Sequence, residues 1–562
     1  MCLLKKIVDS SDKQQFPFPE EPDAWNIYVL VGLGFPINWI KGIGPTKRAS
    51  VVNFFKEGSY EDIDIEFLDE TFNGAEEIVP FKLDLGEFPQ KYYGLLNGVI
   101  NNSSITEIVF TWDHIEEVLS DKTVSEFASL MEALKTNKHV AQLSLLRNLR
   151  PNEGYKDVRV VCFGDMLKAN TCITDLDLSL NRISRPDFVM LMKALKTNVR
   201  ITRLNLSSNH IDDAGATPVA EMLDGNDTLR KLDLSNNTIG NAGAMALAEM
   251  LEKNKTLSCL VLSKNEIGKE GGKILAEALK INEVLTQLDL SWNPIKVSGV
   301  ESLARALTPQ VFTGELDYRG IPINVSESLR CNITLTSLDL SGTQMGDVGA
   351  NAVAEMLKQN ETLTNLRLSN IGISQTGVEV IMEAVANSKS LSYLDFSSNN
   401  IAWWIPIMEM LDKNTSLLKL DLSGNPLSAL NAGALMVGWR RNKTLIEFVL
   451  CNMQMAGENI ETLKEFLKSN TSLVTINWGG NKICDVGAKA LAEVLQENSS
   501  WTELDLSWNE IGVSGATALV EALKVNSTLT KLSLEGNPLG DSIREAISGA
   551  LELNSSITNV EL

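Results

Sequence analysis

The sequence predicts an α/β solenoid in which one short strand and one helix alternate along most of the chain. A motif of the form NTTLxxLDLSxNxIGxxGAxALAEMLKxN recurs with a 28-residue period. Leucines that alternate with polar residues indicate a strand with one buried face, and apolar residues at three- and four-residue spacing indicate an amphipathic helix. One such pair cannot bury both apolar faces alone, so successive copies must stack.

An asparagine just after each strand marks the register of the repeats. It keeps the 28-residue period at Asn181, Asn209, Asn237, Asn265 and Asn293, and again at Asn481, Asn509 and Asn537. Less regular copies fill the interval, with one 22-residue step (321 to 343) and one 26-residue step (399 to 425). Counting from 105–110 to 557–562 gives seventeen strands, and the fold is expected to hold about 16 copies of the 28-residue repeat.

The ends of the predicted helices follow the same rule in most copies. A glycine is expected just before each helix, where the chain turns closely, at Gly215, Gly243, Gly299, Gly349, Gly377, Gly487 and Gly515. An asparagine ends the helix, because this residue tolerates the left-handed conformation that can terminate one. Several of these asparagines, such as Asn254, open an Asn-x-Ser/Thr triplet. Their place before the next strand favours a structural role over glycosylation.

The motif LxxLxLxxN, the 28-residue period and the full helix together resemble the ribonuclease inhibitor-like subtype of leucine-rich repeats over residues 101–562. This resemblance implies a horseshoe with a parallel sheet on the concave face and helices on the convex face. It also implies a ladder in which asparagines such as Asn237 satisfy main-chain groups of adjoining loops. The function that it implies is recognition of another protein.

Residues 1–100 do not repeat and are predicted to form an N-terminal capping region, which would shield the first stacking face. Within it, LDL at 83–85 suggests a degenerate strand. The stretch INWIKGIGPTKRASVVNFF at 37–55 is similar to a helix-hairpin-helix, whose glycine turn would admit a DNA phosphate. A single copy among many acidic residues weakens that interpretation.

Composition excludes several classes of chemistry. Seven cysteines without CxxC spacing and three scattered histidines predict no metal site, no catalytic site and no cofactor. A net charge of −22 disfavours nucleic acid and favours a protein partner with a basic patch. No uncharged apolar stretch reaches about 18 residues, and the N-terminus lacks the apolar core of a secretory signal. We therefore expect a cytoplasmic protein that does not span a membrane.

A column of acidic residues is predicted on the concave face, four positions before the register asparagine. Its members include Asp289, Asp317, Asp339, Asp395 and Asp505. Like charges about 5 Å apart on neighbouring strands repel each other. One interpretation is that the column binds a basic partner; the other is that Asp is the default residue of this repeat and has no binding role.

Departures from the default residues are the stronger candidates for partner binding. Arg319 and Arg367 interrupt the acidic column, and Tyr393 replaces a small or charged residue. Trp292 and Trp508 stand one residue before the register asparagine, where no core is available to bury them. Trp and Arg are enriched among residues that dominate binding energy. The resemblance implies that both tryptophans lie at the concave rim, on strands seven and fifteen, where they could grip one partner.

Three further tryptophans are assigned mainly to packing. Trp478 occupies a leucine position and is predicted to be core. Trp403 and Trp404 precede Pro406 in the 26-residue copy, where they could fill the space of the missing turn or form a second binding patch.

The predicted function is a non-enzymatic scaffold for protein–protein interaction. Alternatives are a GTPase regulator resembling the Ran GTPase-activating protein, a sensor resembling the nucleotide-oligomerisation receptors but without their ATPase module, and a bacterial effector secreted into a host cytoplasm. The last strand, ITNVEL at 557–562, has no cap after it. Such an edge is expected to mark a truncated chain or to allow self-association.

Overall fold

The computed structural model describes residues 81–84, 105–111, 121–146, 158–309 and 331–562. The remainder of the predicted capping region, the helix-hairpin-helix-like stretch at 37–55, and Asp317 and Arg319 lie outside the described residues. The chain divides into two compact units, Met1–Asn265 and Glu266–Leu562. Each is described by itself.

In the first unit, parallel strands alternate with helices. Its elements are β1 (Phe81–Asp84), β2 (Ile105–Thr111), α7 (Asp121–Thr136), β3 (Gln142–Leu146), α8 (Val158–Ala169), β4 (Asp175–Asp177), α9 (Arg185–Thr197), β5 (Arg203–Asn205), α10 (Asp213–Leu223), β6 (Lys231–Asp233), α11 (Asn241–Lys253) and β7 (Cys259–Val261). Each strand pairs in parallel with the next one in sequence, from β1 to β7. The degenerate strand predicted at 83–85 is β1, which pairs with β2.

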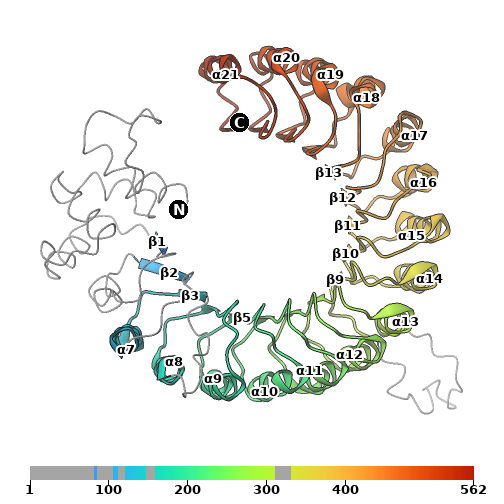
Figure 1. Ribbon diagram of the computed structural model, residues 1–562. Helices are drawn as coiled ribbons and strands as arrows, with labels where there is room; N and C mark the ends of the chain where they lie inside the picture. The colour runs from blue at the N-terminus through green and yellow to red at the C-terminus, as the bar shows by residue number, and fades with distance from the viewer. Residues whose placement is uncertain (1–80, 85–104, 112–120, 147–157, 310–330) are drawn as a thin grey trace, which may run out of the picture. The chain divides into compact units, whose positions relative to one another are not determined.

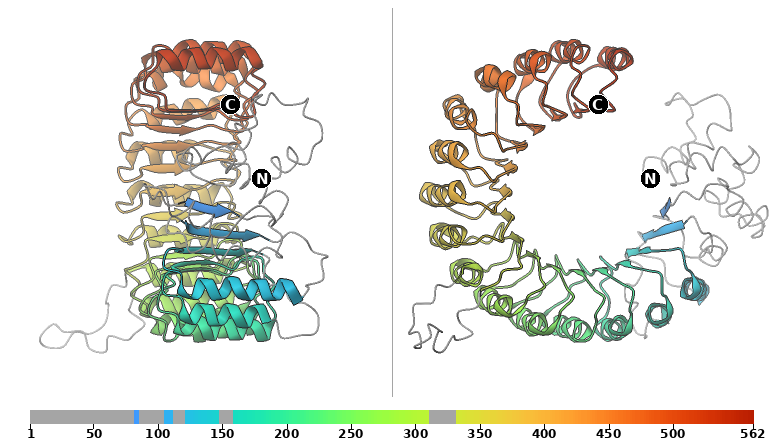
Figure 2. Two further views of the ribbon diagram at one scale, coloured as in Figure 1. Left: turned by 90° about the vertical axis from the view of Figure 1, so that its left-hand side faces the viewer. Right: turned by 180° about the vertical axis from the view of Figure 1, so that it is seen from behind.

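The second unit repeats the same alternation. Its elements are α12 (Lys269–Ile281), β8 (Gln287–Asp289), α13 (Lys296–Leu307), β9 (Ser337–Asp339), α14 (Gly346–Leu357), β10 (Asn365–Arg367), α15 (Gln375–Asn387), β11 (Tyr393–Asp395), α16 (Ile405–Lys413), β12 (Lys419–Asp421), α17 (Ala429–Trp439), β13 (Glu447–Val449), α18 (Gly457–Ser469), β14 (Thr475–Asn477), α19 (Cys484–Glu497), β15 (Glu503–Asp505), α20 (Val513–Leu523), β16 (Lys531–Ser533), α21 (Asp541–Leu553) and β17 (Asn559–Glu561). Consecutive strands pair in parallel from β8 to β17. In each unit the strands line the inner side of an arc and the helices the outer side (Figures 1 and 2).

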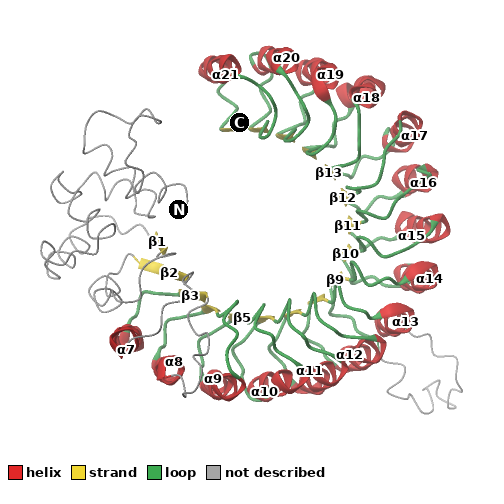
Figure 3. Cartoon of the chain, viewed as in Figure 1, coloured by secondary structure: helices red, strands yellow, loops and turns green. Residues whose placement is uncertain are grey.

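Figure 3 shows this division into an inner layer of strands and an outer layer of helices. The core lies between the layers, because the middle residue of each short strand and the apolar stripe of each helix point toward each other. Leu288 of β8 is 2% exposed, and Leu303 of α13 is fully buried. Trp478 is also fully buried, as its leucine position predicts. The predicted α/β leucine-rich-repeat solenoid is confirmed.

The register asparagines form the expected ladder. The Asn237 side-chain amide donates to the main-chain oxygens of Leu206 and Leu234 at 3.1 and 2.9 Å. Its Oδ1 accepts from the N–H groups of Asn209 and Ile211, both at 2.9 Å. One side chain thus satisfies four buried main-chain groups in two repeats, which explains why the residue type recurs.

A second ladder runs along the helix ends, and here the predicted conformation is wrong. Asn254 follows α11 with φ −67° and ψ 132°, which is extended rather than left-handed. Its Oδ1 accepts from the N–H groups of Thr256 and Leu257, and its Nδ2 donates to the Leu223 main-chain oxygen at 3.1 Å. The side chain is 7% exposed. These bonds account structurally for the Asn-x-Ser/Thr triplets.

The recurrent glycines lie inside the first helical turn rather than before the helix, which corrects the sequence prediction. Gly243 is the third residue of α11. The Asp213 carboxylate of the preceding repeat accepts from the N–H groups of Gly240 and Gly243 at 2.6 and 2.7 Å. A Cβ on Gly243 would lie 2.8 Å from that oxygen. A Cβ would also lie 2.7 Å from Ile239 Cγ2, so glycine at 243 leaves room both for this side chain and for the carboxylate that caps the helix.

The longest interval between described strands separates β8 from β9. These strands pair directly, with Gln287 opposite Ser337 and Asp289 opposite Asp339. Because β8 and β9 are direct neighbours, the described part of the chain has sixteen strands between residues 105 and 562, β2 to β17, where the sequence predicted seventeen.

The residues that make the interval between β8 and β9 longer than the others are inserted after the end of α13. The N–H of Asn332 donates to the main-chain oxygen of Ala306 at 2.7 Å, a bond that elsewhere joins residues four apart, as between Asn254 and Met250. The Asn332 side-chain amide donates to the main-chain oxygen of Asn282 at 2.9 Å, as such asparagines do to their counterparts in the preceding repeat. Asn332 therefore closes α13 as the other asparagines close their helices. The extra residues are inserted between the end of α13 and Asn332.

Candidate functional site

The inner face of the second unit carries the candidate binding residues. The first and third residues of each three-residue strand point to this face, because side chains alternate along a strand and the middle one is buried. From β8 to β17 these positions hold eight carboxylates and three cations. The carboxylates are Asp289, Asp339, Asp395, Asp421, Glu447, Glu503, Asp505 and Glu561, and the cations are Arg367, Lys419 and Lys531. The face is therefore negative.

The acidic column has a role in the fold. Asp289, Asp339 and Asp505 each accept a hydrogen bond at 2.9 Å from the main-chain N–H two residues later. Asp395 does the same at 3.0 Å, and its Oδ1 also accepts from the Ser397 hydroxyl at 2.7 Å. These bonds close the turn at the end of each strand. They explain why Asp is the default residue at this position without reference to a partner.

The column is nevertheless electrostatically unfavourable in places. Burial raises the pKa of Asp339 above its ordinary value, and the neighbouring carboxylate of Asp289 raises it further. Burial also raises the pKa of Asp421, to which Asp395 adds. Partly buried like charges on adjacent strands shift pKa values in this direction. A cationic partner group placed here would relieve the repulsion.

Arg367 occupies the Asp position on β10, and the fold compensates for the missing carboxylate. The N–H of Ser369, which an Asp would bind, donates instead to the Ser341 hydroxyl of the preceding repeat at 3.1 Å. The same replacement occurs where Val449 stands in the column, because the N–H of Cys451 donates to Ser423 Oγ at 3.0 Å. The turn is closed without residue 367, so the Arg367 side chain is not required for it.

Arg367, Tyr393 and Lys419 form a cluster on three adjacent strands, which we call the cation–tyrosine cluster. Arg367 Cζ lies 5.6 Å from the centroid of the Tyr393 ring, and Lys419 Nζ lies 5.2 Å from it. Both distances are within the range of cation–π attraction, which contributes about 0.5–1 kcal/mol at exposed sites. Burial raises the pKa of the Tyr393 hydroxyl, and the charge of Asp395 adds to the effect.

Carboxylates hold the outer sides of the cluster. Arg367 Nη1 lies 3.8 Å from Asp339 Oδ2, and Lys419 Nζ lies 2.6 Å from Glu447 Oε1. The Arg367 side chain remains 53% exposed, so it is ordered by contacts on one side and open to solvent on the other.

Trp292 and Trp508 lie three residues after β8 and β15, at the edge of the inner face. They are 50% and 64% exposed. Both adopt a φ of 56°, the left-handed region. In other repeats this position is held by glycines such as Gly424 and Gly480 or by asparagines such as Asn452. A bulky residue there costs roughly 1–2 kcal/mol.

Each of these tryptophans lies over a glycine in the next repeat. A Cβ added to Gly342 would come within 2.6 Å of the Trp292 ring, and one added to Gly536 would come closer still to Trp508. Gly342 and Gly536 occupy the tryptophan position of the following copy. One face of each indole is thus held against the backbone and the other is presented to solvent. The Trp508–Gly536 pairing follows from the regular 28-residue period, whereas the Trp292–Gly342 pairing is visible only once the register across the insertion after α13 is known.

The predicted site residues are partly brought together. Tyr393 and Arg367 are in contact, and Lys419, which the sequence did not indicate, completes the cluster. Trp292 and Trp508 are seven strands apart, not eight, because no strand intervenes between β8 and β9. At about 4.8 Å per strand this is roughly 34 Å along the sheet, with β11 and Tyr393 between them.

Two kinds of site are not found in the described part of the chain. No group of three or more His, Cys, Asp or Glu side chains there is arranged to hold a metal ion. None of the helices described is both long and apolar enough to cross a membrane.

Comparison with known proteins identifies the repeats. The family model described as "Leucine Rich repeat" matches ten segments: 169–186, 197–220, 225–248, 253–276, 282–304, 331–354, 413–430, 469–492, 497–520 and 525–548. No curated protein matches the chain in sequence. Together with the strand–helix units described above, the matched segments show that the chain is a leucine-rich repeat protein. The ribonuclease inhibitor-like subtype stays a prediction.

Three solved structures are similar to parts of this chain. The actin-binding site 2 structure of leiomodin-1 is 27% identical and covers 22% of this chain and 75% of its own, with a TM-score of 0.22. The tropomodulin C-terminal domain of Caenorhabditis elegans is 20% identical and covers 26% and 90%, with a TM-score of 0.23. An internalin from Listeria monocytogenes is 19% identical and covers 66% and 88%, with a TM-score of 0.36.

Proposed function

We propose that this leucine-rich repeat protein is a non-enzymatic scaffold that binds a protein partner on the inner face of its second unit. The observation that supports this most directly is the cation–tyrosine cluster. Its three side chains are ordered by one another and by Asp339 and Glu447, yet the Arg367 position contributes nothing to closing its own turn. Solvent-facing Arg and Tyr in an ordered arrangement are typical of residues that dominate binding energy.

The charge of the face indicates the partner. Eight carboxylates against three cations favour a basic surface, and the raised pKa values of Asp339 and Asp421 are consistent with uncompensated charge there. Trp292 and Trp508 would contact the same partner through their exposed indole faces. Because each indole already rests on a glycine, binding would immobilise few additional rotatable side-chain bonds, so the entropic cost of binding would be small.

A catalytic role for the inner face is not part of the proposal. Its Asp carboxylates are engaged in closing turns. Burial raises the pKa of Cys451 to about 11, so this thiol stays protonated and unreactive at neutral pH.

The test is affinity capture with the full chain and matched variants. Tyr393→Ala and the pair Trp292→Ala with Trp508→Ala alter the inner face. Val525→Ala is the control, because it shortens an exposed apolar side chain just beyond the end of α20, outside the inner face. We expect wild type and Val525→Ala to retain the same partner, and the inner-face variants to lose most of it. Circular dichroism checks that all four proteins are folded.

Two results would overturn the proposal. Equal recovery of the partner by wild type and by both inner-face variants would exclude the inner face. If the purified protein accelerated GTP hydrolysis by any member of a panel of small GTPases, the non-enzymatic scaffold would be excluded in favour of the GTPase-regulator alternative.

A further inference from the structure

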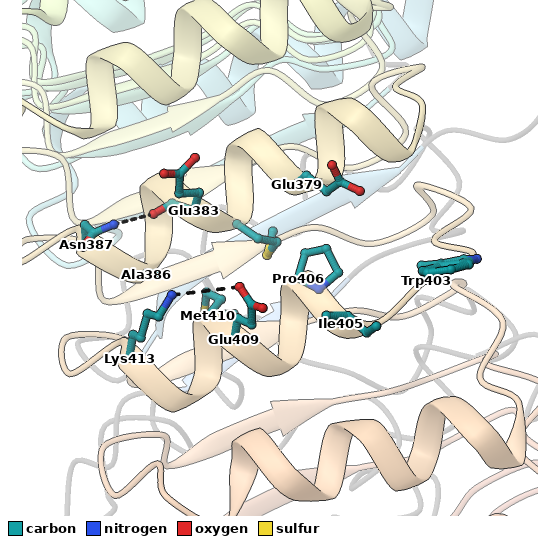
Figure 4. Close-up of a pocket in the computed structure, with 11 residues that line it drawn as sticks. Glu379, Glu383, Ala386, Asn387, Trp403, Ile405, Pro406, Glu409, Met410 and Lys413 are labelled. Carbon is teal, nitrogen blue, oxygen red and sulfur yellow. Dashed lines mark hydrogen bonds and ion pairs between the residues drawn. The ribbon is translucent and has the colours of Figure 1, made fainter.

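The outer face of the second unit contains a groove between α15 and α16. Its volume is about 460 Å³. Glu379 and Glu383 of α15 lie on one side, and Pro406, Glu409 and Lys413 of α16 lie on the other (Figure 4). Trp403 lies at one end, beside the start of α16. None of these residues belongs to the inner face.

The shortened repeat accounts for this groove. The register asparagines Asn399 and Asn425 are 26 residues apart, whereas Asn209 and Asn237 are 28 residues apart. α16 has nine residues, whereas α15 has 13. Pro406 stands in the first turn, where a missing N–H is tolerated. The sequence thus removes about one turn of the outer layer and leaves a hollow beside α15.

The two tryptophans at this point have separate roles. Trp404 is 1% exposed and fills the core below the missing turn, which confirms the packing interpretation for this residue. Trp403 is 65% exposed. Its main chain is held by Gln375 of α15, whose side-chain amide donates to the Trp403 oxygen and accepts from the Trp403 N–H, both at 3.3 Å. The indole is therefore presented from an anchored backbone.

The groove has an apolar floor. Met382, Ala386 and Met410 form buried parts of the lining. Ile405 is 45% exposed next to Trp403. An apolar side chain of a partner would therefore find contacts at the Trp403 end of the groove.

The walls of the groove are acidic. Elsewhere on the outer helices glutamates pair with a lysine three residues later, as Glu277 does with Lys280 and Glu521 with Lys524. α15 contains no lysine or arginine. Within the described residues, Glu379 and Glu383 form no ion pair. The pKa of Lys358, the residue after α14, is raised mainly by its hydrogen bond to Glu355, with which it is paired, and the charge of Glu383 adds to the effect.

We propose that this groove binds a basic segment of a partner protein, with an apolar side chain against Trp403 and Ile405 and lysine or arginine side chains between Glu379, Glu383 and Glu409. Charge complementarity selects this occupant: three carboxylates of the lining face one cation, Lys413, which lies 3.9 Å from Glu409. An exposed indole adds affinity for both an apolar side chain and a cation. The site is distinct from the inner face and uses different residues.

The experiment uses the full chain and a fluorescein-labelled twelve-residue peptide made of three Leu-Lys-Lys-Leu units, titrated by fluorescence anisotropy. Two peptides serve as controls, one with Glu for every Lys and one with Ser for every Leu. The variants are Trp403→Ser, the pair Glu379→Gln with Glu383→Gln, and the pair Glu493→Gln with Glu521→Gln. The last pair changes the net charge equally on α19 and α20. Tyr393→Ala reports on the inner face.

We expect the basic peptide to bind, and both control peptides to bind at least fivefold more weakly. Trp403→Ser and the groove glutamate pair should each weaken binding at least fivefold. The control glutamate pair should leave it within twofold of wild type. Weakening by Tyr393→Ala would place the peptide on the inner face and overturn the proposal. Equal weakening by both glutamate pairs would show general charge attraction and overturn the proposal. So would unchanged binding in Trp403→Ser, or dimerisation that Trp403→Ser abolishes in light scattering.

Discussion

The inner face around Tyr393 and the outer groove beside Trp403 lie in adjacent parts of the same repeats but arise in different ways. On the inner face the backbone is regular, and single substitutions place Arg367, Tyr393 and Lys419 on paired strands. At the groove α15 lacks the lysines that pair with glutamates on other outer helices, and the next repeat is two residues shorter, which leaves these glutamates beside an open groove.

This contrast shows two routes by which a repeat protein gains a distinctive surface. Substitution keeps the stack intact when a neighbour can take over a lost hydrogen bond, as Ser341 does for Ser369. Deletion requires a large side chain to refill the core, as Trp404 does. The proposed binding residues are therefore separable from residues needed for folding on the inner face, whereas at the groove the two kinds are neighbours in sequence.

The largest expected effect separates the two adjacent tryptophans. Trp404→Ala should lower the free energy of unfolding by about 3–5 kcal/mol, because it leaves a cavity in the core. Trp403→Ala should change it by less than about 0.5 kcal/mol, because its side chain is exposed. Chemical denaturation measures both. Trp404→Phe should be milder, since the Trp404 Nε1 has no hydrogen-bond partner to lose among the residues that the structure describes. A large loss in Trp403→Ala would contradict the division of roles.

A glycine substitution tests the support beneath an indole at the rim of the inner face. Gly342→Ala should cost about 1–2 kcal/mol for its left-handed φ of 69°, plus the displacement of the Trp292 ring. Combining Gly342→Ala with Trp292→Ala should remove the cost of displacing the ring. The loss of unfolding free energy in the double variant should therefore be smaller than the sum of the two single losses. Gly433→Ala is the matched control, because no atom lies near a Cβ there and alanine favours the helix. Strict additivity in thermal unfolding would argue against the pairing.

A smaller change in stability tests whether Arg367 serves the fold. Arg367→Asn supplies a side-chain oxygen that can accept from the N–H of Ser369, as Asn205 does for Ser207. The free energy of unfolding should stay within about 0.5 kcal/mol of wild type, since the substitution is on the surface. Partner capture should nevertheless fall. A marked loss of stability with normal capture would reverse this assignment.

The smallest expected effect concerns pH. The pKa of Asp339 is raised in the folded chain, so the folded state binds this proton more tightly than the unfolded state does. The contribution of Asp339 to stability therefore falls as the pH rises above 3.8, the ordinary pKa of an Asp side chain. Asp339→Asn keeps the acceptor for Ser341 and removes the charge. It should slightly raise the unfolding temperature at pH 7 and give no gain near pH 3. A gain at both pH values would exclude this electrostatic origin.

Much of the fold follows from the sequence because each repeat must bury the same apolar faces. The register asparagines, the strand centres and the core position of Trp478 are all set by that local requirement. The recurrent glycines show its limit: their spacing is plain, but at Gly243, Gly377 and Gly515 a carboxylate of the preceding repeat contributes to the requirement. Such contacts join residues of different copies and cannot be read from one copy.

The candidate site was predictable only in part. Exposed Trp292, Trp508, Tyr393 and Arg367 stand out because they break the repeat pattern. For the acidic column the sequence left two interpretations open, partner binding and the default residue of the repeat, and its hydrogen bonds to the following turns give it a structural role. Nothing in the sequence singles out Lys419. It joins the candidate site only because β11 and β12 are neighbouring strands.

The sequence by itself determined the repeat, its alternation of strand and helix, and the residues that depart from it, since these depend on local periodicity. The tertiary structure decided which departures meet. It paired β8 with β9 across the insertion, laid Trp292 on Gly342, and opened a groove where α16 is short. The physical reason is that stacking sets distances between residues of different repeats, and those distances depend on where insertions and deletions fall.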